Sequence, residues 1–574
     1  MLGRKQDRLL KQEIYAQKVA QSQTQHHSAC ETLNKNDNEE FLSDLSENDT
    51  EFTLKVRSGQ SKQMRERLPT VAKMADRFAL SDRATAAIAT ATLRDLEIIR
   101  KDNIAKAIHC NHERRFSTLE GVDPFKIRRE RKKARVETLE LQRSLEGSLQ
   151  GLYFDGKRNV TLQSGKKKVV EEHISLVSEP GSKYIGHVTP NGGLAIDLAD
   201  SILQFLEANN YDLTQLKVVG ADGTAHNTGH IGGAITLLEN RLGKSLQWQI
   251  CLLHFNELPL RHLILHLDGT TSGPNSFTGP IGKQLKTCEE KPIVKFNTIR
   301  ADLPEIDPKL LSTDQKYLLE ICNAVSTGDF PDALAKKDPG LLCHARWLTA
   351  ANRILRLYVT EDRPSKNLKM IAKYIIRVYA PVWFMIKRNW QFYYASKHVW
   401  QSIKLSRYLP EDVRAVAIDP YIQLNGYALH PENMLVTMLS DSRTAVRKRA
   451  VELIVAARRN LQQQSVRQFR PPQINFSARD YPELIEWKNV TPPPALRGIT
   501  DQELEEAIED CDFVERLPQF PCHTQAVERT VQLVTQASTK VCGTEARDGL
   551  IRNTLESRKA IPCVKNKRSF AALQ

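Results

Sequence analysis

The chain of 574 residues carries a formal net charge of +14, and 41% of its residues are hydrophobic. That content can fill the cores of about two to four globular domains, and the surplus of Lys and Arg favours nucleic acid as a polyanionic partner. The most apolar stretch, "MIAKYIIRVYAPVWFMIKRNW", is interrupted by Lys373, Arg377 and Pro381, which excludes it as a membrane span. The charged opening, "MLGRKQDRLLKQEIYAQK", is unlike a secretory signal, so we expect an intracellular protein with no membrane partner.

Residues 1–60 are rich in Gln, Asn, Ser and acidic residues and predict a disordered, solvated tail. Residues 61–145 predict a helical, basic region, with one helix beginning near Pro69 and a second capped by Ser81 or Asp82. A third helix holds a cluster of basic side chains, namely Lys126, Arg128, Arg129, Arg131, Lys132, Lys133 and Arg135. This cluster is typical of a DNA-backbone contact or a nuclear import signal, and equally of a solvated charged helix.

Residues 146–290 mix strand and helix patterns. Three strand-like runs, "GLYFDGKRNVTL", "VVEEHISLVS" and "KYIGHVTP", precede a helix, a strand, a helix and a further strand in "LQWQICLLHF". This order predicts the first part of a ribonuclease H-like α/β core, a mixed sheet with flanking helices.

Two aspartates stand out in this predicted core. Asp155 lies in the first strand, and Asp222 follows the fourth in "LKVVGADGTAHNTG". In such a core these two strands are neighbours, so we expect the carboxylates to lie together and to bind Mg²⁺ or Mn²⁺, which would offset their mutual repulsion. The alternative for Asp222 is an Asx-turn, in which the carboxylate bonds only its own backbone.

The remaining residues predict a long helical interruption of the core. Residues 291–465 read as an all-α insertion, in which a stripe of aromatic residues is more typical of a helical core than of a base-stacking surface. Residues 466–515 form a Pro-rich connector, and residues 516–574 supply the last helix of the core and a C-terminal tail.

The motifs in this order resemble the hAT superfamily of DNA transposases. Asp155 and Asp222 match the first two acids of the family's Asp-Asp-Glu triad, and Glu528 in "HTQAVERTVQLVTQAS" matches the third. Cys251 and His254 in "ICLLHF" match the family's C-x-x-H motif. Further along, Arg346 and Trp347 match an R-W pair at the start of a helix in its insertion.

The resemblance implies a nuclear protein that cleaves and joins DNA phosphodiesters, with Asp155, Asp222 and Glu528 holding Mg²⁺ or Mn²⁺ ions. It further implies that Trp347 stacks on an extruded base. Arg346 would pair a phosphate or form a structural salt bridge. Cys251 and His254 would support the site. Zinc binding is the less favoured alternative, because a structural site needs four ligands and no second pair is evident, so a buried strand Cys with a hydrogen-bonded His is preferred.

Residues 1–150 contain no Cys and His cluster with the spacing of the zinc finger that opens many members of this superfamily. The basic helix is therefore the expected DNA contact. A catalytically inactive, transposase-derived DNA-binding or assembly protein is the alternative function, and a homo-oligomer is left open.

Overall fold

The computed structural model describes residues 67–98, 122–144, 148–163, 168–273, 276–300, 302–342, 347–459, 466, 468–487, 496 and 498–560. The predicted tail, residues 1–60, lies outside them. The chain divides into two compact units, one of Met1–Arg67 with Arg83–Ile127 and one of Leu68–Asp82 with Arg128–Gln574. In the first unit the described residues belong mainly to helix α4 (Asp82–Asp95) and the start of α5 (Pro124–Ser144).

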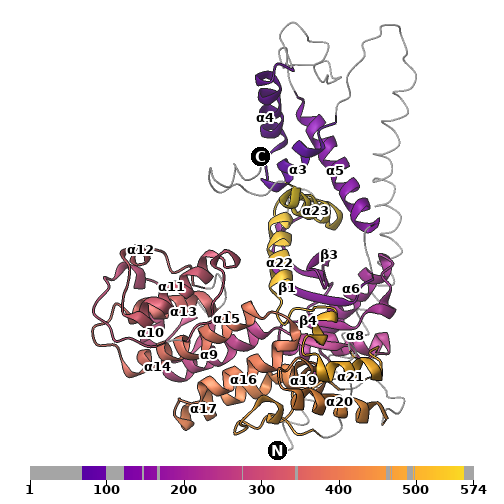
Figure 1. Cartoon of the computed structure of the whole chain (residues 1–574). Coiled ribbons are helices and arrows are strands. Elements are labelled where there is room, and N and C mark those ends of the chain that lie inside the picture. The colour runs from indigo at the N-terminus through magenta and orange to yellow at the C-terminus, as the bar shows by residue number, and fades with distance from the viewer. Residues whose placement is uncertain are drawn as a thin grey trace, which may run out of the picture. The chain divides into compact units, whose positions relative to one another are not determined.

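The second unit contains a mixed five-stranded sheet in the order β3-β2-β1-β4-β5 (Figure 1). Its strands are β1 (Gly151–Leu162), β2 (Lys168–Glu179), β3 (Lys183–Val188), β4 (Val218–Ala221) and β5 (Gln247–Ile250). β1, β2 and β3 form an antiparallel meander, whereas β4 pairs in parallel with both β1 and β5. The α/β class and a mixed sheet, predicted from the sequence, are confirmed.

Each face of the sheet is buried. Alternate residues of β1, Leu152 and Phe154, pack with α6 (Ala195–Ala208) and α8 (Ala234–Leu242) in one core. Tyr153 points to the other face and joins a larger core shared with the helices that follow the sheet. Because β4 is covered on both faces, all four of its residues are buried, which explains its continuous apolar run.

One strand is shorter than its sequence indicates. In "LQWQICLLHF" the strand β5 ends at Ile250, and Cys251 becomes the N-terminal cap of helix α9 (Leu252–Asp268). The reason is a change of apolar spacing, since Leu253, Leu260 and Ile264 are buried along one helix. Cys251 and His254 therefore lie at the start of a helix and not on a strand.

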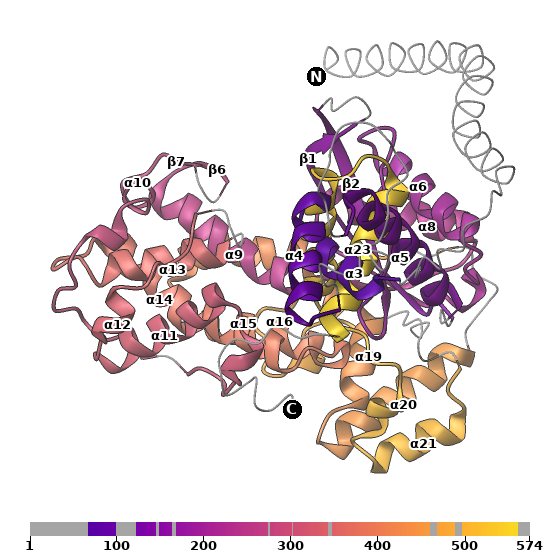
Figure 2. The same ribbon diagram turned by 90° about the horizontal axis from the view of Figure 1, so that it is seen from above.

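After α9 the described chain is almost entirely helical. Its elements are the hairpin β6 (Thr271–Gly273) and β7 (Ser276–Phe277), then α10 (Pro280–Gln284), α11 (Thr313–Thr327), α12 (Asp332–Ala335), α13 (Trp347–Tyr358), α14 (Lys366–Tyr374), α15 (Ala380–Arg388), α16 (Ala395–Ser406), α17 (Glu411–Ala417), α18 (Asp419–Leu424), α19 (Pro431–Leu439), α20 (Thr444–Arg459) and α21 (Asp501–Glu509). Helices α9, α13 and α14 pack against one another (Figures 1 and 2). The predicted aromatic core is present here, because Tyr374, Tyr379, Trp383 and Phe384 are all buried.

The chain then returns to the sheet. Helix α22 (Gln525–Ser538) packs on β1 and β2, and α23 (Thr544–Ala560) packs on both α22 and α3 (Pro69–Arg77), as Figure 1 shows. Segments from both ends of the chain thus meet in the second unit.

A buried ionic cluster joins these terminal segments. The Asp76 carboxylate of α3 accepts hydrogen bonds from Arg131 at 2.8 Å, from Arg135 at 2.8 and 2.9 Å, and from Asn553 of α23 at 3.0 Å. The Asp76 side chain is fully buried. A charge in this position needs its partners, since an unpaired buried carboxylate is costly.

Candidate carboxylate site

The ladder between the two central strands runs toward both Asp155 and Asp222. The parallel ladder of β1 and β4 pairs Leu152 with Val219 and ends at Tyr153 with Gly220, and Asp222 follows the end of β4 at Ala221. Continued for two residues beyond its last pair, the same register would bring Asp155 opposite Asp222. Asp155 lies two residues after Tyr153 in β1 and therefore projects to the face that carries Tyr153.

Asp222 is also a turn residue. One oxygen, Oδ1, accepts hydrogen bonds from the Thr224 amide at 3.1 Å, the Thr224 hydroxyl at 2.8 Å and the Asn227 side chain at 2.7 Å. This is the predicted Asx-turn, to which Asn227 adds a further donor. Because all three bonds go to one oxygen, the turn leaves Oδ2 available for another partner.

Steric contacts explain why glycine occupies positions 220 and 223, on either side of Asp222. The ring of Tyr153 lies over Gly220, where a Cβ atom would stand 2.3 Å from Cδ1 of the tyrosine. A Cβ atom at Gly223 would stand 2.9 Å from Oδ1 of Asn425 and 3.2 Å from Cδ2 of His254. The sharp turn after β4 therefore fits closely among its neighbours, and His254 lies directly against it.

Glu528 lies in the first turn of α22, over the same face of the sheet. The hydroxyl groups of Ser175 and Thr530 lie 2.5 Å apart, and Ser175 is the cross-strand partner of Asp155. Residues two apart on a helix point in nearly opposite directions, so Glu528 does not share the sheet-facing direction of Thr530. The Thr524 hydroxyl donates to Glu528 Oε1 at 3.0 Å.

The segment before α22 is fixed to the sheet and to α9. The Tyr153 hydroxyl donates to the Pro521 carbonyl oxygen at 2.6 Å, and the Leu252 amide donates to the Cys522 carbonyl oxygen at 2.9 Å. The Thr524 amide donates to Sγ of Cys251 at 3.4 Å. Cys251 thus helps to position Thr524, and through it Glu528.

Asp155 and Asp222 supply some of the oxygen ligands that a hard divalent ion requires. Mg²⁺ is commonly held by one or two carboxylates together with water and substrate phosphates, and Asp155 with Asp222 meets that requirement. Within the described ranges, however, no group of three or more His, Cys, Asp or Glu side chains is close enough to hold a metal ion. In this arrangement Glu528 therefore does not complete a three-residue site with Asp155 and Asp222.

The predicted base-stacking residue is buried. Trp347 begins α13, is only 7% exposed and packs edge-to-face on Phe277 with ring centroids 6.2 Å apart. It would have to leave this contact to stack on a base. Arg346 lies outside the described residues.

The basic helix divides into two sets of residues. Arg131 and Arg135 are committed to Asp76, and Arg131 also pairs with Asp82 at 2.8 Å. Arg129, Lys132 and Lys133 are exposed, as is Arg128, which meets Asp82 at 3.3 Å. Lys126 is half-buried. Of the seven basic residues predicted to contact DNA, four carry charges that face solvent, namely Arg128, Arg129, Lys132 and Lys133.

A cationic group beside α22 was not predicted from the sequence. Lys387, in the last turn of α15, donates to Gln525 Oε1 at 2.6 Å, and Arg529 lies one helical turn beyond Gln525. Burial, reinforced by Arg529, lowers the pKa of Lys387 to about 8. Burial also lowers the pKa of His523 to about 3, so this imidazole is neutral near pH 7. In the described part of the chain no carboxylate forms an ion pair with Lys387 or Arg529.

Trp390 departs from the predicted aromatic core, to which the run "RNWQFYY" assigns it. Its neighbours Phe392 and Tyr393 are buried, but Trp390 is 38% exposed. Its carbonyl oxygen accepts from the Cys522 amide at 2.8 Å, which holds it beside the segment leading to α22. The available signal was its position between the basic pair Lys387 and Arg388 and a polar residue.

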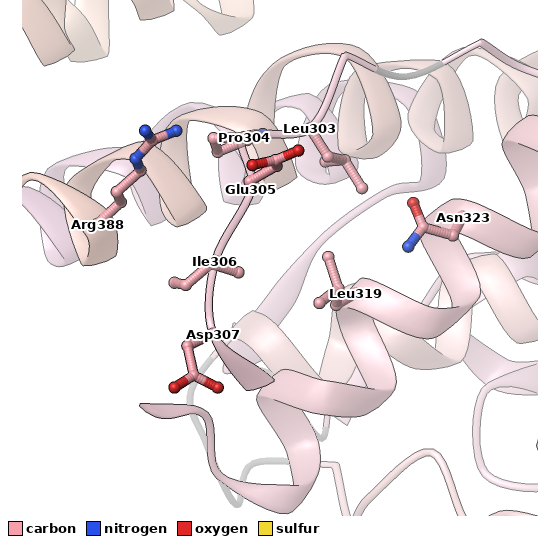
Figure 3. A pocket seen from close by; sticks show the side chains of 8 residues that line it. All are labelled: Leu303, Pro304, Glu305, Ile306, Asp307, Leu319, Asn323 and Arg388. Carbon is pink, nitrogen blue, oxygen red and sulfur yellow. The ribbon is translucent and has the colours of Figure 1, made fainter. Parts of the chain in front are cut away.

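An open pocket of about 620 Å³ lies elsewhere (Figure 3). Its lining comes from the loop 303–307, from Leu319 and Asn323 of α11, and from Arg388. No residue of the sheet or of α22 contributes, so this pocket is separate from the carboxylates.

No family model and no curated protein matches this chain. The proposed function therefore rests on the residues of this chain. None of the helices built from described residues has the length and apolarity to cross a bilayer.

Proposed function

We propose that this protein is a hAT-like transposase, or a host protein derived from one, that acts on DNA phosphodiesters in the nucleus. The observation that carries the proposal is the parallel β1–β4 ladder, whose register, continued past its last pair, would bring Asp155 opposite Asp222 on the sheet face covered by α22. The meander followed by parallel strands supports a ribonuclease H-like core, and the helices between β5 and α22 correspond to the family's insertion.

In this proposal Asp155, Asp222 and Glu528 would hold Mg²⁺ or Mn²⁺. When bound, the metal activates the attacking oxygen and stabilises the leaving one. The chain's own residues orient these carboxylates: Thr224 and Asn227 fix Asp222, Thr524 fixes Glu528, and Cys251 fixes Thr524. The turn bonds only to Oδ1 of Asp222, so Oδ2 is not used by the turn.

A second candidate is a DNA-binding or assembly protein that keeps the fold without the chemistry. The observation that favours it is the saturation of Asp222 Oδ1 by three local donors, which is the pattern of a structural turn. In this case the basic surfaces keep their DNA contacts, and the carboxylates stabilise only the fold.

Nicking of supercoiled DNA by the purified chain separates these functions. The enzyme requires Mg²⁺ or Mn²⁺ and loses about a hundredfold or more of its rate in Asp155→Asn, Asp222→Asn and Glu528→Gln, because each removes a negative ligand from the metal site. The control is Asp212→Asn, since Asp212 makes a similar local turn with Thr214 outside the site. DNA binding without metal-dependent nicking would support the second candidate and exclude the first.

A further inference from the structure

A surface at the start of α22 combines two cations with one exposed aromatic ring. Lys387 and Trp390 come from the end of α15 and the turn after it, and Arg529 comes from the first turns of α22. We call Lys387, Trp390 and Arg529 the strand-binding surface. We propose that it binds a single strand of DNA, with Lys387 and Arg529 on phosphates and Trp390 stacked on a base. The proposal rests on the proposed function for its choice of DNA.

The two elements of this surface are fixed to each other. Lys387 bonds Gln525 at 2.6 Å, and the Cys522 amide bonds the Trp390 carbonyl oxygen at 2.8 Å. The Phe392 amide in turn donates to the Phe520 carbonyl oxygen at 2.9 Å. Backbone and side-chain bonds thus hold the turn after α15 alongside the start of α22. A rigid surface of this kind binds without first having to order its side chains.

The two cations of the surface favour an anionic ligand. Gln525 offers only a neutral oxygen to Lys387, and the groups that lower the pKa of Lys387 are its own burial and the cation Arg529. Two neighbouring cations that no described carboxylate pairs repel each other unless an anion lies between them. A phosphodiester supplies that charge, and its oxygens accept from both Lys and Arg.

The aromatic ring indicates an unpaired strand. Trp390 is exposed, whereas the aromatic residues around it are buried, so its ring presents a face to solvent. Bases inside a duplex are covered by their neighbours, but the bases of a single strand can stack on a protein ring, irrespective of sequence.

Fluorescence anisotropy with a labelled oligothymidine in EDTA tests this inference without any metal or catalysis. Trp390→Ala should weaken binding by about tenfold, while Trp390→Tyr keeps most of the affinity because it keeps a stacking ring. Lys387→Gln and Arg529→Gln should each weaken binding about threefold and reduce the salt slope by about 0.7.

The matched control is Arg388→Gln, which removes one exposed charge next to Lys387 but on the pocket side. It should change the affinity less than twofold. If Arg388→Gln weakened binding as much as Lys387→Gln does, the effect would be one of net charge, and the inference would be overturned. Unchanged affinity in Trp390→Ala would also overturn it. A duplex of the same length should bind Trp390→Ala and the original protein alike. Failure of metal-dependent nicking would reject the enzyme proposal and leave this result in place.

Discussion

Tyr153 of β1 donates a 2.6 Å hydrogen bond to the carbonyl oxygen of Pro521, which lies 368 residues further along the chain. This bond fixes the segment before α22 to the strand that carries Asp155. Both groups are buried, so water cannot replace the tyrosine hydroxyl if it is removed.

Tyr153→Phe should therefore lower the free energy of unfolding by about 1–2 kcal/mol, because it leaves a buried carbonyl oxygen without a donor. Urea denaturation followed by circular dichroism measures this loss. Tyr408→Phe is the control, since its ring is partly exposed and keeps Arg377 over its face. Equal losses in the two variants would mean that the Tyr153 bond adds nothing specific.

Asp222→Asn should leave the melting temperature nearly unchanged in metal-free buffer. The asparagine keeps the one oxygen that accepts from Thr224 and Asn227, and it relieves repulsion with Asp155. Added Mg²⁺ or Mn²⁺ should raise the melting temperature of the original protein but not of the variant, because a ligand stabilises only the state that binds it. Differential scanning fluorimetry makes the comparison, and equal shifts would reduce Asp222 to a turn residue.

Replacing the exposed basic residues Arg128, Arg129, Lys132 and Lys133 with Gln should flatten the dependence of duplex binding on salt. Each lost phosphate contact lowers the slope by about 0.9. Titrations between low and moderate salt give this slope directly. An unchanged affinity and slope would remove the basic helix from the DNA interface.

Arg135→Gln should behave differently from its exposed neighbours. It removes two hydrogen bonds from the buried Asp76 carboxylate, so we expect a loss of about 2 kcal/mol in unfolding free energy with the salt slope preserved. Lys132→Gln, one turn away and exposed, should cost close to nothing. Chemical denaturation of the two variants checks this contrast, which would fail if both were equally stable.

Single-strand binding should depend on pH through Lys387. Its pKa is lowered to about 8 in the free protein, and a bound phosphate favours the charged form. The affinity gained from Lys387 is therefore complete below pH 8 and is lost as the pH rises through the higher pKa of the complex. His523, with a pKa of about 3, stays neutral throughout this range. Anisotropy titrations from pH 7 to 10 should show a decline that Lys387→Gln lacks.

The sheet could be predicted from the sequence because strand signals are local. The run predicted at residues 151–162 is β1 itself, and the meander order fixes which strands become neighbours. The expectation that Asp155 and Asp222 lie close together rests on that order. The end of β5 was harder, because "CLLHF" is apolar in either conformation and only its later spacing indicates a helix.

Properties that depend on tertiary partners could not be predicted. Arg131 and Arg135 look like their exposed neighbours in the sequence, and only the position of Asp76 assigns them to the interior. Trp347 and Trp390 are equally aromatic, but one packs on Phe277 and the other faces solvent. Burial of a single side chain depends on what folds over it, and that information lies far away in the chain.

The ionic cluster around Asp76 has a consequence for dividing this protein into fragments. A fragment of residues 61–145 would carry Asp76, Arg131 and Arg135 away from Asn553, and its complement would leave Asn553 with neither Asp76 nor the Thr138 hydroxyl that donates to it at 2.8 Å. Neither half would keep its own interior satisfied. We therefore expect α5 and α23 to fold and unfold together, and neither to be stable in a fragment that lacks the other.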